Sequence, residues 1–368
     1  MNFAILCRAL ALSNQSLVAA IKSLGSPDQI FAQHPDALGQ WFNQKDISRI
    51  RHWHNSGNVL ENCAVIEKTL KAEDASVLSL ADKNYPVTLA EIPDPPAVLF
   101  IKGTSSSLEI PQIALVGSRN CTAQGRRIAQ DFAAELSCAG FCITSGLALG
   151  IDAAAHQGAL RYEGKTCAVM GTGLDVIYPA RNQSLAREIL AKGGALVSEF
   201  LPGSPPLAWH FPYRNRIVTG LSLGVLVVEA NERSGSLISA RLAAEQGREV
   251  FVIPGNLMSP VSAGCNRLIR EGATLVTEPR QVVDQLGPMF GFQLQTQRQH
   301  SDAMPELQSA PASGEEHWLI EQMGYDPIDV DGLCTLCERS SSEITAALAE
   351  LELDGKVTQT VFGYQRCV

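Results

Sequence analysis

Aromatic side chains and long uncharged apolar runs are both scarce in this chain of 368 residues. Phe, Trp and Tyr together make up 6% of the sequence. No uncharged stretch approaches the roughly 18 apolar residues of a membrane-spanning helix, so we expect no membrane association. Met1 to Leu12 is apolar, but Arg8 interrupts it and no small-residue cleavage pattern follows, so no signal peptide is expected. We therefore expect a cytoplasmic protein whose ten cysteines stay reduced.

Positive charge is also scarce, because the chain has 29 Lys and Arg residues and 38 Asp and Glu residues, which gives a net charge of −9. A uniformly negative protein would repel nucleic acid. Counted by segment, residues 1–110 carry 9 basic and 11 acidic groups (−2), residues 111–285 carry 16 and 14 (+2), and residues 286–368 carry 4 and 13 (−9). Fourteen of the 16 cations in the middle segment are arginines, whose planar guanidinium suits phosphate. The total therefore hides a middle segment able to accept an anion and a strongly acidic tail.

Four segments with different patterns follow one another along the chain. Apolar residues at helical spacing come first, then short apolar runs with glycine-rich loops, then a Gln-, Ser- and Pro-rich stretch. The last segment has the pattern of three helices and two short strands, the order of a winged helix, with Ser340 and Glu343 at capping-box spacing. The expected parts are a helical module at 1–72, a main domain at 73–286, a linker at 287–312 and a winged-helix domain at 313–368.

The main domain begins with apolar runs at 77–80 and 97–101, which predict a strand, a turn and a strand. Apolar runs then alternate with glycine-rich loops and helical stretches. These runs lie at 113–116, 141–144, 167–170, 195–197, 225–228, 249–253 and 274–276. Runs that are apolar on both faces and alternate with helices predict an α/β fold with a doubly wound parallel sheet covered on both sides. Ligands of such sheets bind where the strands end.

The loops after these predicted strands are rich in small residues and arginines. Gly117-Ser118-Arg119 stands between a strand and a helix, where backbone N–H groups and the helix dipole favour an anion, and the arginine favours phosphate. Four further loops at the same sheet edge repeat this chemistry. Their candidate residues are Ser145, Gly146 and Gly150, then Gly171, Gly173, Arg181 and Asn182, then Arg214, Asn215 and Arg216, then Ser234, Gly235 and Ser236. The sequence therefore predicts one binding site for a phosphate-bearing ligand.

Several of the few aromatic residues cluster in one polar loop. Trp209 and Phe211 lie beside Arg214 and Arg216 in the sequence. Aromatic faces beside arginines are typical of a platform on which the bases of single-stranded nucleic acid stack. The alternative is that these rings form a hydrophobic plug over the end of the sheet.

Two glycine motifs resemble nucleotide-binding sequences but depart from them. Gly164-Lys165-Thr166 resembles the end of a P-loop, yet Ala159 stands where the motif needs glycine, and a strand follows it. Gly171 and Gly173 are followed by Val176 where the dinucleotide motif needs its third glycine. The sequence supports neither ATP hydrolysis nor nicotinamide chemistry, and we expect no cofactor.

No catalytic or metal-binding constellation stands out among the titratable residues. Cys334 and Cys337 form one CxxC pair, but without a second pair we expect ordinary thiols and no metal site. His156 could shuttle protons, although we favour a packing role at its loop-helix junction. The acidic residues at the same sheet edge are expected to orient the arginines and hold loop N–H groups. These residues are Asp152, Asp175, Glu199 and Glu229.

Taken in order, these motifs resemble the DNA processing protein DprA (Smf) family. The resemblance is carried by Tyr85-Pro86, Asp94-Pro95-Pro96, Gly117-Ser118-Arg119, the runs from Ser145 to Asp152, Gly171 to Pro179, Phe211 to Ile217 and Ser234 to Ile238, and Val250-Phe251-x-x-Pro254-Gly255. It implies an extended Rossmann-like domain, flanked by a sterile-alpha-motif-like helical module and a winged helix. It further implies a homodimer that binds single-stranded DNA, protects incoming strands during natural transformation and helps to load the recombinase RecA, and the lack of a catalytic constellation adds the expectation that the protein is not an enzyme. The phosphate site would then include Gly117, Ser118 and Arg119, and the stacking ring would be Trp209 or Phe211.

A Rossmann-like nucleotide-processing hydrolase is the alternative. The chain is also similar to the lysine decarboxylase-like phosphoribohydrolases, which carry a Pro-Gly-Gly-x-Gly-Thr-x-x-Glu loop with a catalytic glutamate. Ser239 occupies the place of that glutamate and cannot supply a carboxylate. The DNA-binding interpretation is therefore preferred.

The candidate recognition helix of the winged-helix domain, residues 341–354, has an unusual charge. It contains no Lys or Arg but carries Glu343, Glu350, Glu352 and Asp354. Duplex phosphates would repel such a helix. We expect this domain to bind a protein, either a partner or the other protomer.

Overall fold

The structure is a computed structural model, and its contacts divide the chain into two compact units, residues 1–303 and 304–368. The residues that it describes are 3–56, 59–162, 164–287, 319, 328–337, 339–353, 357–360 and 363–366. In this described part, every helix is too short or too polar to cross a membrane.

The first unit is built on a nine-stranded sheet with the order β1-β2-β6-β5-β4-β3-β7-β8-β9. The strands are β1 (Ala75–Ser79), β2 (Val98–Gly103), β3 (Gln112–Val116), β4 (Cys142–Ser145), β5 (Thr166–Val169), β6 (Ala195–Ser198), β7 (Gly224–Val227), β8 (Glu249–Val252) and β9 (Thr274–Leu275). Strands β3 to β9 are parallel, whereas β1 and β2 add an antiparallel edge. The predicted parallel sheet is confirmed, and each predicted apolar run overlaps a strand.

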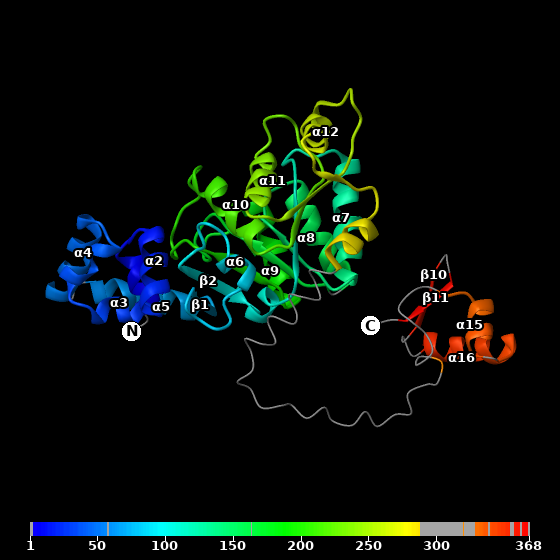
Figure 1. The fold of residues 1–368 in the computed structure, drawn as a ribbon, viewed down its shortest axis with the longest axis horizontal. Helices are drawn as coiled ribbons and strands as arrows, with labels where there is room; N and C mark the ends of the chain where they lie inside the picture. Colours follow the sequence, from blue (N-terminus) through cyan, green and yellow to red (C-terminus); the bar gives the residue numbers. More distant parts are fainter. Residues whose placement is uncertain are drawn as a thin grey trace. The chain divides into compact units, whose positions relative to one another are not determined.

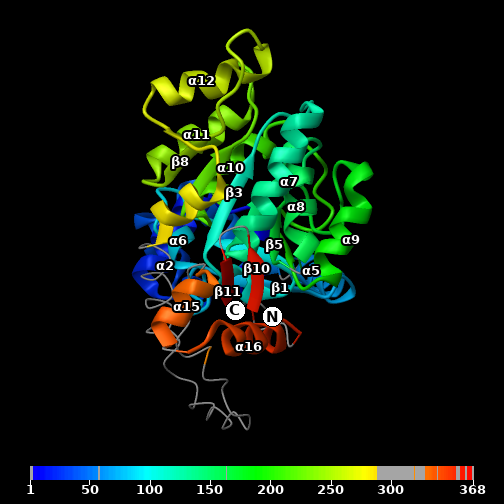
Figure 2. The same cartoon turned by 90° about the vertical axis from the view of Figure 1, so that its right-hand side faces the viewer.

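Helices cover both faces of the sheet because successive residues of each strand point to opposite sides. Ile113 and Leu115 of β3 belong to one core, whereas Ala114 and Val116 belong to the other. One face carries α6 (Val87–Ala90), α10 (His210–Gly220), α11 (Ser236–Glu245) and α12 (Ala263–Arg270). The opposite face carries α7 (Ala123–Cys138), α8 (Ile151–Ala159), α9 (Gln183–Ala191) and the helical residues 279–287. Figure 2 shows these two layers with the sheet between them.

The predicted N-terminal module is helical and shares a hydrophobic core with the sheet. Its helices are α1 (Phe3–Ala9), α2 (Asn14–Leu24), α3 (Pro27–Ala32), α4 (Gln44–Ser56) and α5 (Val59–Ala72). They pack in one cluster with β2 and α9, and Figure 1 shows them beside β1 and β2. Arg8 donates a hydrogen bond to the Glu199 carbonyl at 2.8 Å, and Asn14 donates one to Asp94 at 2.8 Å. The expected boundary near residue 72 therefore separates two types of secondary structure that share one core.

The second unit contains α15 (Val330–Cys337), α16 (Ser341–Leu353) and the antiparallel pair β10 (Val357–Thr360) and β11 (Gly363–Arg366). The predicted capping box is confirmed. The Ser340 N–H donates to Glu343 Oε2 at 3.1 Å, and the Glu343 N–H donates to Ser340 Oγ at 3.4 Å. The first of the three expected helices, apart from Leu319, and the expected linker beyond residue 287 lie outside the described residues. Cys334 and Cys337 are partly buried in α15, and the described residues include no cluster that could hold a metal ion.

Candidate functional site

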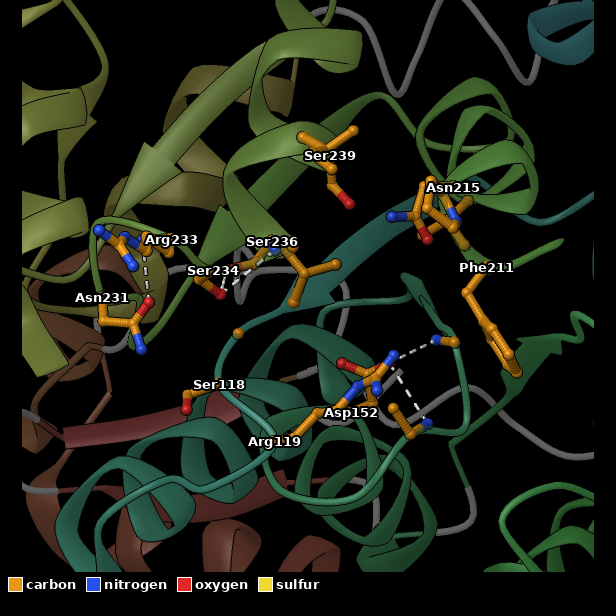
Figure 3. Close-up of a pocket in the computed structure, with 18 of the residues that line it drawn as sticks. Ser118, Arg119, Asp152, Phe211, Asn215, Asn231, Arg233, Ser234, Ser236 and Ser239 are labelled. Carbon is orange, nitrogen blue, oxygen red and sulfur yellow. Dashed lines mark hydrogen bonds between the residues drawn. The ribbon is translucent and has the colours of Figure 1, made fainter. Parts of the chain in front are cut away.

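An open pocket of about 580 Å³ lies where the sheet topology changes direction. Strands β3 and β7 are neighbours, but the chain leaves β3 toward β4 on one side and β7 toward β8 on the other. The loops after the two strands diverge, and such a switch point is where open α/β sheets bind ligands. Figure 3 shows Ser118 and Arg119 below Arg233 and Ser234, with Phe211 at the right.

The pocket brings together the predicted residues of three loops and of the first turns of α10. These residues are Gly117, Ser118, Arg119, Gly146, Phe211, Arg214, Asn215, Ser234, Gly235 and Ser236. The other predicted residues do not line it: Ser145, Gly150, Gly171, Gly173, Arg181, Asn182, Trp209 and Arg216. Ten of the 18 predicted residues therefore line this pocket, and eight do not.

Several of the non-lining residues hold the loops in place. The Ser145 hydroxyl donates to the Leu115 carbonyl at 2.6 Å, and Asn182 donates to the Leu147 carbonyl at 2.8 Å. Gly150 has φ +80° and lies so close to the Ser118 carbonyl that a Cβ would overlap it. In the same way, Gly171 leaves room for the Phe211 ring, and Gly173 leaves room for the Leu201 carbonyl. These residues shape the site without facing it.

Hydrogen bonds from neighbouring segments hold the loop that carries Arg119. The Ser118 N–H donates to the Glu229 carbonyl at 2.7 Å, and the Ile151 N–H donates to the Ser118 carbonyl at 3.2 Å. Helix α7 begins after Thr122, whose hydroxyl accepts the Gly125 N–H at 2.9 Å. The Glu229 carboxylate accepts the Thr122 N–H at 2.9 Å, which confirms the role expected for this acid.

Arg214 lies beneath the pocket and is only 4% exposed. Its guanidinium donates to the Val169 carbonyl and lies so close to Gly146 that a Cβ there would overlap it. The Asp152 carboxylate accepts the Gly146 N–H at 3.1 Å and the Ala148 N–H at 3.4 Å, as expected for an acid that holds a loop. Burial lowers the pKa of Arg214 to about 10, and burial also raises the pKa of Asp152, while each charge favours the other. Arg214 therefore stays positively charged at neutral pH.

Arg216 lies away from the pocket, although it is only two residues further along the same helix. Its guanidinium is 2.8 Å from Glu199 and 3.0 Å from Asp94, and it stacks at 4.1 Å from the centre of the Tyr213 ring. Its side chain is 7% exposed. The sequence-based assignment of Arg216 to the phosphate site has no support in this geometry, because two carboxylates already neutralise the side chain. The expectation that Glu199 orients an arginine is confirmed.

The exposed cations of the pocket are Arg119 and Arg233. Neither forms an ion pair with any residue that the structure describes. The guanidinium carbon of Arg119 lies 5.8 Å from the centre of the Phe211 ring. Arg233 was not among the predicted residues, although its place beside Ser234-Gly235-Ser236 was a signal for it. With Arg214 and Asp152 included, the lining carries three positive charges and one negative charge.

The start of α11 forms the wall on which Arg233 lies. Gly235 precedes this helix and supplies no side-chain cap, while the hydroxyl oxygens of Ser234 and Ser236 lie 2.7 Å apart. Hydroxyl groups and the positive end of a helix dipole both favour an anion. This wall therefore complements the Arg119 loop across the pocket.

Two further expectations concern residues outside the lining. The Asp175 carboxylate accepts the Gly203 N–H at 2.8 Å, so it holds a loop as predicted. His156 is fully buried, with Nδ1 2.7 Å from Thr166 Oγ1, and burial lowers its pKa to about 3. The ring is therefore neutral and packed, which confirms the expectation for His156.

The fold and the pocket define a class of protein, a Rossmann-like α/β protein with a cationic site at its topological switch point. The model of the family DNA recombination-mediator protein A matches residues 76–287, and that of the DprA winged helix domain matches residues 303–360. The chain belongs to the DprA family, which confirms the resemblance inferred from its motifs.

Relatives and solved structures agree with this assignment. The chain is 44% identical to Protein Smf of Escherichia coli over 283 residues, which cover 77% of this chain and 75% of that one. It is 48% identical to DNA processing protein DprA of Streptococcus pneumoniae over 209 residues, which cover 56% of this chain and 72% of that one. The crystal structure of S. pneumoniae DprA matches with a TM-score of 0.66 at 38% identity, covering 76% of this chain and 97% of that one. The structure of DprA from Helicobacter pylori, described for its single-stranded DNA binding mode, matches with a TM-score of 0.53 at 33% identity. The match covers 58% of this chain and 96% of that one.

Proposed function

We propose that this pocket binds the phosphate backbone of single-stranded DNA. The observation that carries the proposal is the pair Arg119 and Arg233, both exposed, lining one open pocket together with the Phe211 ring. Arginines bind phosphate, and an aromatic ring offers a stacking surface for an unpaired base. The single-stranded DNA binding described for the H. pylori relative supports the proposal.

An unpaired strand suits this site better than a duplex. The Phe211 ring lies beside the cations in a pocket, and only a base that has left the stack can reach a ring there. The lining also carries a net charge of +2, although the whole chain is at −9. The local charge at the pocket, and not the total, then governs binding.

Titration of labelled single-stranded and duplex oligonucleotides at several salt concentrations tests the proposal. The wild type should prefer the single strand, and Arg119→Ala and Arg233→Ala should each weaken binding to all sequences alike. Each phosphate contact removed should make the slope of log K against log salt shallower by about 0.7. Arg187→Ala is a matched control, because Arg187 is an exposed arginine on α9 outside the pocket lining. Wild-type affinity in both pocket variants would refute the assignment.

We further propose that the site binds without catalysis. Among the residues that line the pocket, Asp152 is the one carboxylate, and two backbone N–H groups hold it beneath the loop. Ser239, at the position of the hydrolase glutamate, also lines the pocket and supplies no acid. Release of free base from nucleoside monophosphates by the purified protein would instead favour the hydrolase.

Membership of the DprA family suggests the wider role of the chain. We propose a cytoplasmic homodimer that protects incoming single strands during natural transformation and helps to load RecA, with the acidic winged helix contacting protein. The name DNA processing protein, carried by the S. pneumoniae relative, supports a role in handling DNA. A strand-exchange assay with RecA and a DNA-covering competitor tests the loading step, since Arg119→Ala should abolish any stimulation.

A further inference from the structure

The geometry points to a second nucleotide subsite outside the pocket, formed by the Tyr178 ring and the Arg181 guanidinium. This inference rests on the proposed function and extends it, because it assigns the direction in which the bound strand leaves the pocket. Tyr178 is 46% exposed, and its ring centre lies 5.5 Å from that of Phe211, at an interplanar angle of 44°. A base that stacks on Phe211 therefore has a second aromatic face next to it.

No hydrogen bond within the described part of the chain accounts for the exposed position of the Tyr178 ring. No hydrogen bond from its hydroxyl to a described residue is found, and the ring does not line the pocket. An exposed aromatic side chain that contacts a pocket ring suits the stacking of a further base.

Arg181 supplies the charge that a second nucleotide needs. It is exposed in the short helix Ala180–Asn182, three residues after Tyr178, and forms no ion pair within the described part of the chain. A ring and a free guanidinium on one short segment match one base and one phosphate of a flexible strand.

The segment that carries both residues is fixed to the pocket. Asn182 is buried, and its side-chain amide donates to the carbonyls of Leu147 at 2.8 Å and Ala148 at 3.1 Å. Ala148 itself lines the pocket. The subsite is therefore held in a constant position relative to the pocket, which lowers the entropy cost of binding both nucleotides together.

Trp209, the other exposed ring nearby, belongs to a different surface. It is 60% exposed but contacts Phe200, His210 and Tyr213, and none of these three lines the pocket. The Tyr213 hydroxyl in turn donates to the Asp94 carboxylate at 3.4 Å. The cation on that side, Arg216, is already paired with Asp94 and Glu199, whereas a strand on the Tyr178 side approaches Arg181, which has no ion pair within the described part of the chain.

Binding of a 20-nucleotide oligothymidylate to full-length variants tests the subsite. Tyr178→Leu keeps an apolar contact for Phe211 but removes the aromatic face, so affinity should fall roughly tenfold, whereas Tyr178→Phe should bind as the wild type does. Arg181→Ala should make the salt slope shallower by about 0.7. Tyr162→Leu is the matched control, because Tyr162 is 69% exposed in the short helix Leu160–Tyr162 after α8 and does not line the pocket.

Photo-crosslinking identifies the contact directly. An oligothymidylate that carries 5-iodouracil should give adducts on Phe211 and Tyr178 when the crosslinked peptides are read by mass spectrometry. Wild-type affinity of Tyr178→Leu with a full loss in Arg119→Ala would overturn the subsite and leave the proposed function intact. Adducts on Trp209 in place of Tyr178 would also overturn it. Wild-type affinity of Arg119→Ala would instead refute the proposed function itself.

Discussion

Replacing Arg216 should destabilise the first unit strongly, because it leaves the buried Glu199 carboxylate and the partly buried Asp94 carboxylate without their partner. Glu199 is 1% exposed and lies 2.8 Å from Arg216, while its next cation, Arg8, is 3.8 Å away. Asp94 accepts a second bond from Arg216 at 3.0 Å. The substitution Arg216→Met keeps the apolar stem and removes the charge.

The size of the effect follows from the burial of the pair. Breaking a buried ion pair by removing one partner costs about 3–5 kcal/mol, most of it the desolvation of the charge left behind. Glu199→Gln in the Arg216→Met background removes the uncompensated charge and should restore a large part of the lost stability. The two substitutions together should therefore cost at least about 1.5 kcal/mol less than the sum of their single effects.

Urea unfolding followed by circular dichroism and tryptophan fluorescence measures these free energies. A cost below about 1 kcal/mol for Arg216→Met, or strictly additive effects in the double variant, would refute the buried-pair reasoning. The same variant also separates a structural role from DNA contact. Because Arg216 is already neutralised, the salt slope for single-stranded DNA should stay as steep as in the wild type, whereas a phosphate contact would make it shallower by about 0.7.

Three further predictions concern other parts of the molecule. Because burial lowers the pKa of His156 to about 3, the unfolded chain binds a proton that the folded chain does not between about pH 6.5 and 3, so this residue lowers stability as pH falls. His156→Asn should make the fall in unfolding free energy from pH 6 to pH 4 shallower by about 1.4 kcal/mol per pH unit, and an unchanged slope would contradict the buried neutral ring. In Gly146→Ala the new Cβ overlaps Arg214, so the substitution should lower the free energy of unfolding by about 1–3 kcal/mol and weaken DNA binding. Gly235→Ala, which has open space around it, should change the free energy of unfolding by less than about 1 kcal/mol. Equal effects of the two substitutions would count against the clash at Gly146. Fragment 304–368 should not retard duplex DNA at physiological salt in a gel-shift assay, and a clear shift would refute protein binding by the acidic helix.

The sheet could be predicted because its strands are apolar on both faces. The run at 113–116 alternates between two cores, and this double burial makes the whole run apolar in the sequence. Helix α6, between β1 and β2, was not expected, because its four residues are too few for a helical period to show. The sequence pattern changes near residue 72, and this change predicted a boundary between two parts. That the two parts share one core could not be predicted, because it depends on tertiary contacts such as that of Arg8 with Glu199.

The candidate site was predictable as a set of loops and not as a set of side chains. Parallel strands bring their carboxyl ends to one edge of the sheet. The loops that carry Gly117, Gly146 and Ser234 could therefore be predicted to lie near one another, and all three residues line the pocket. Whether an arginine is exposed depends on the carboxylates that fold against it, and those come from distant segments. Asp94 lies 122 residues from Arg216 in the chain, and no local pattern links the two.

Helix α10 explains why a count of arginines is a poor measure of the charge available to DNA. Two residues along an α-helix correspond to a turn of about 200°, so Arg214 and Arg216 point to nearly opposite sides. Arg214 holds the loops beneath the pocket, and Arg216 pairs with carboxylates that the N-terminal helices also reach. Both arginines lie on the helix that presents Phe211, and both are buried. The attraction for a strand then comes from the exposed arginines around that ring, which makes binding depend on the position of a few charges more than on the total of −9.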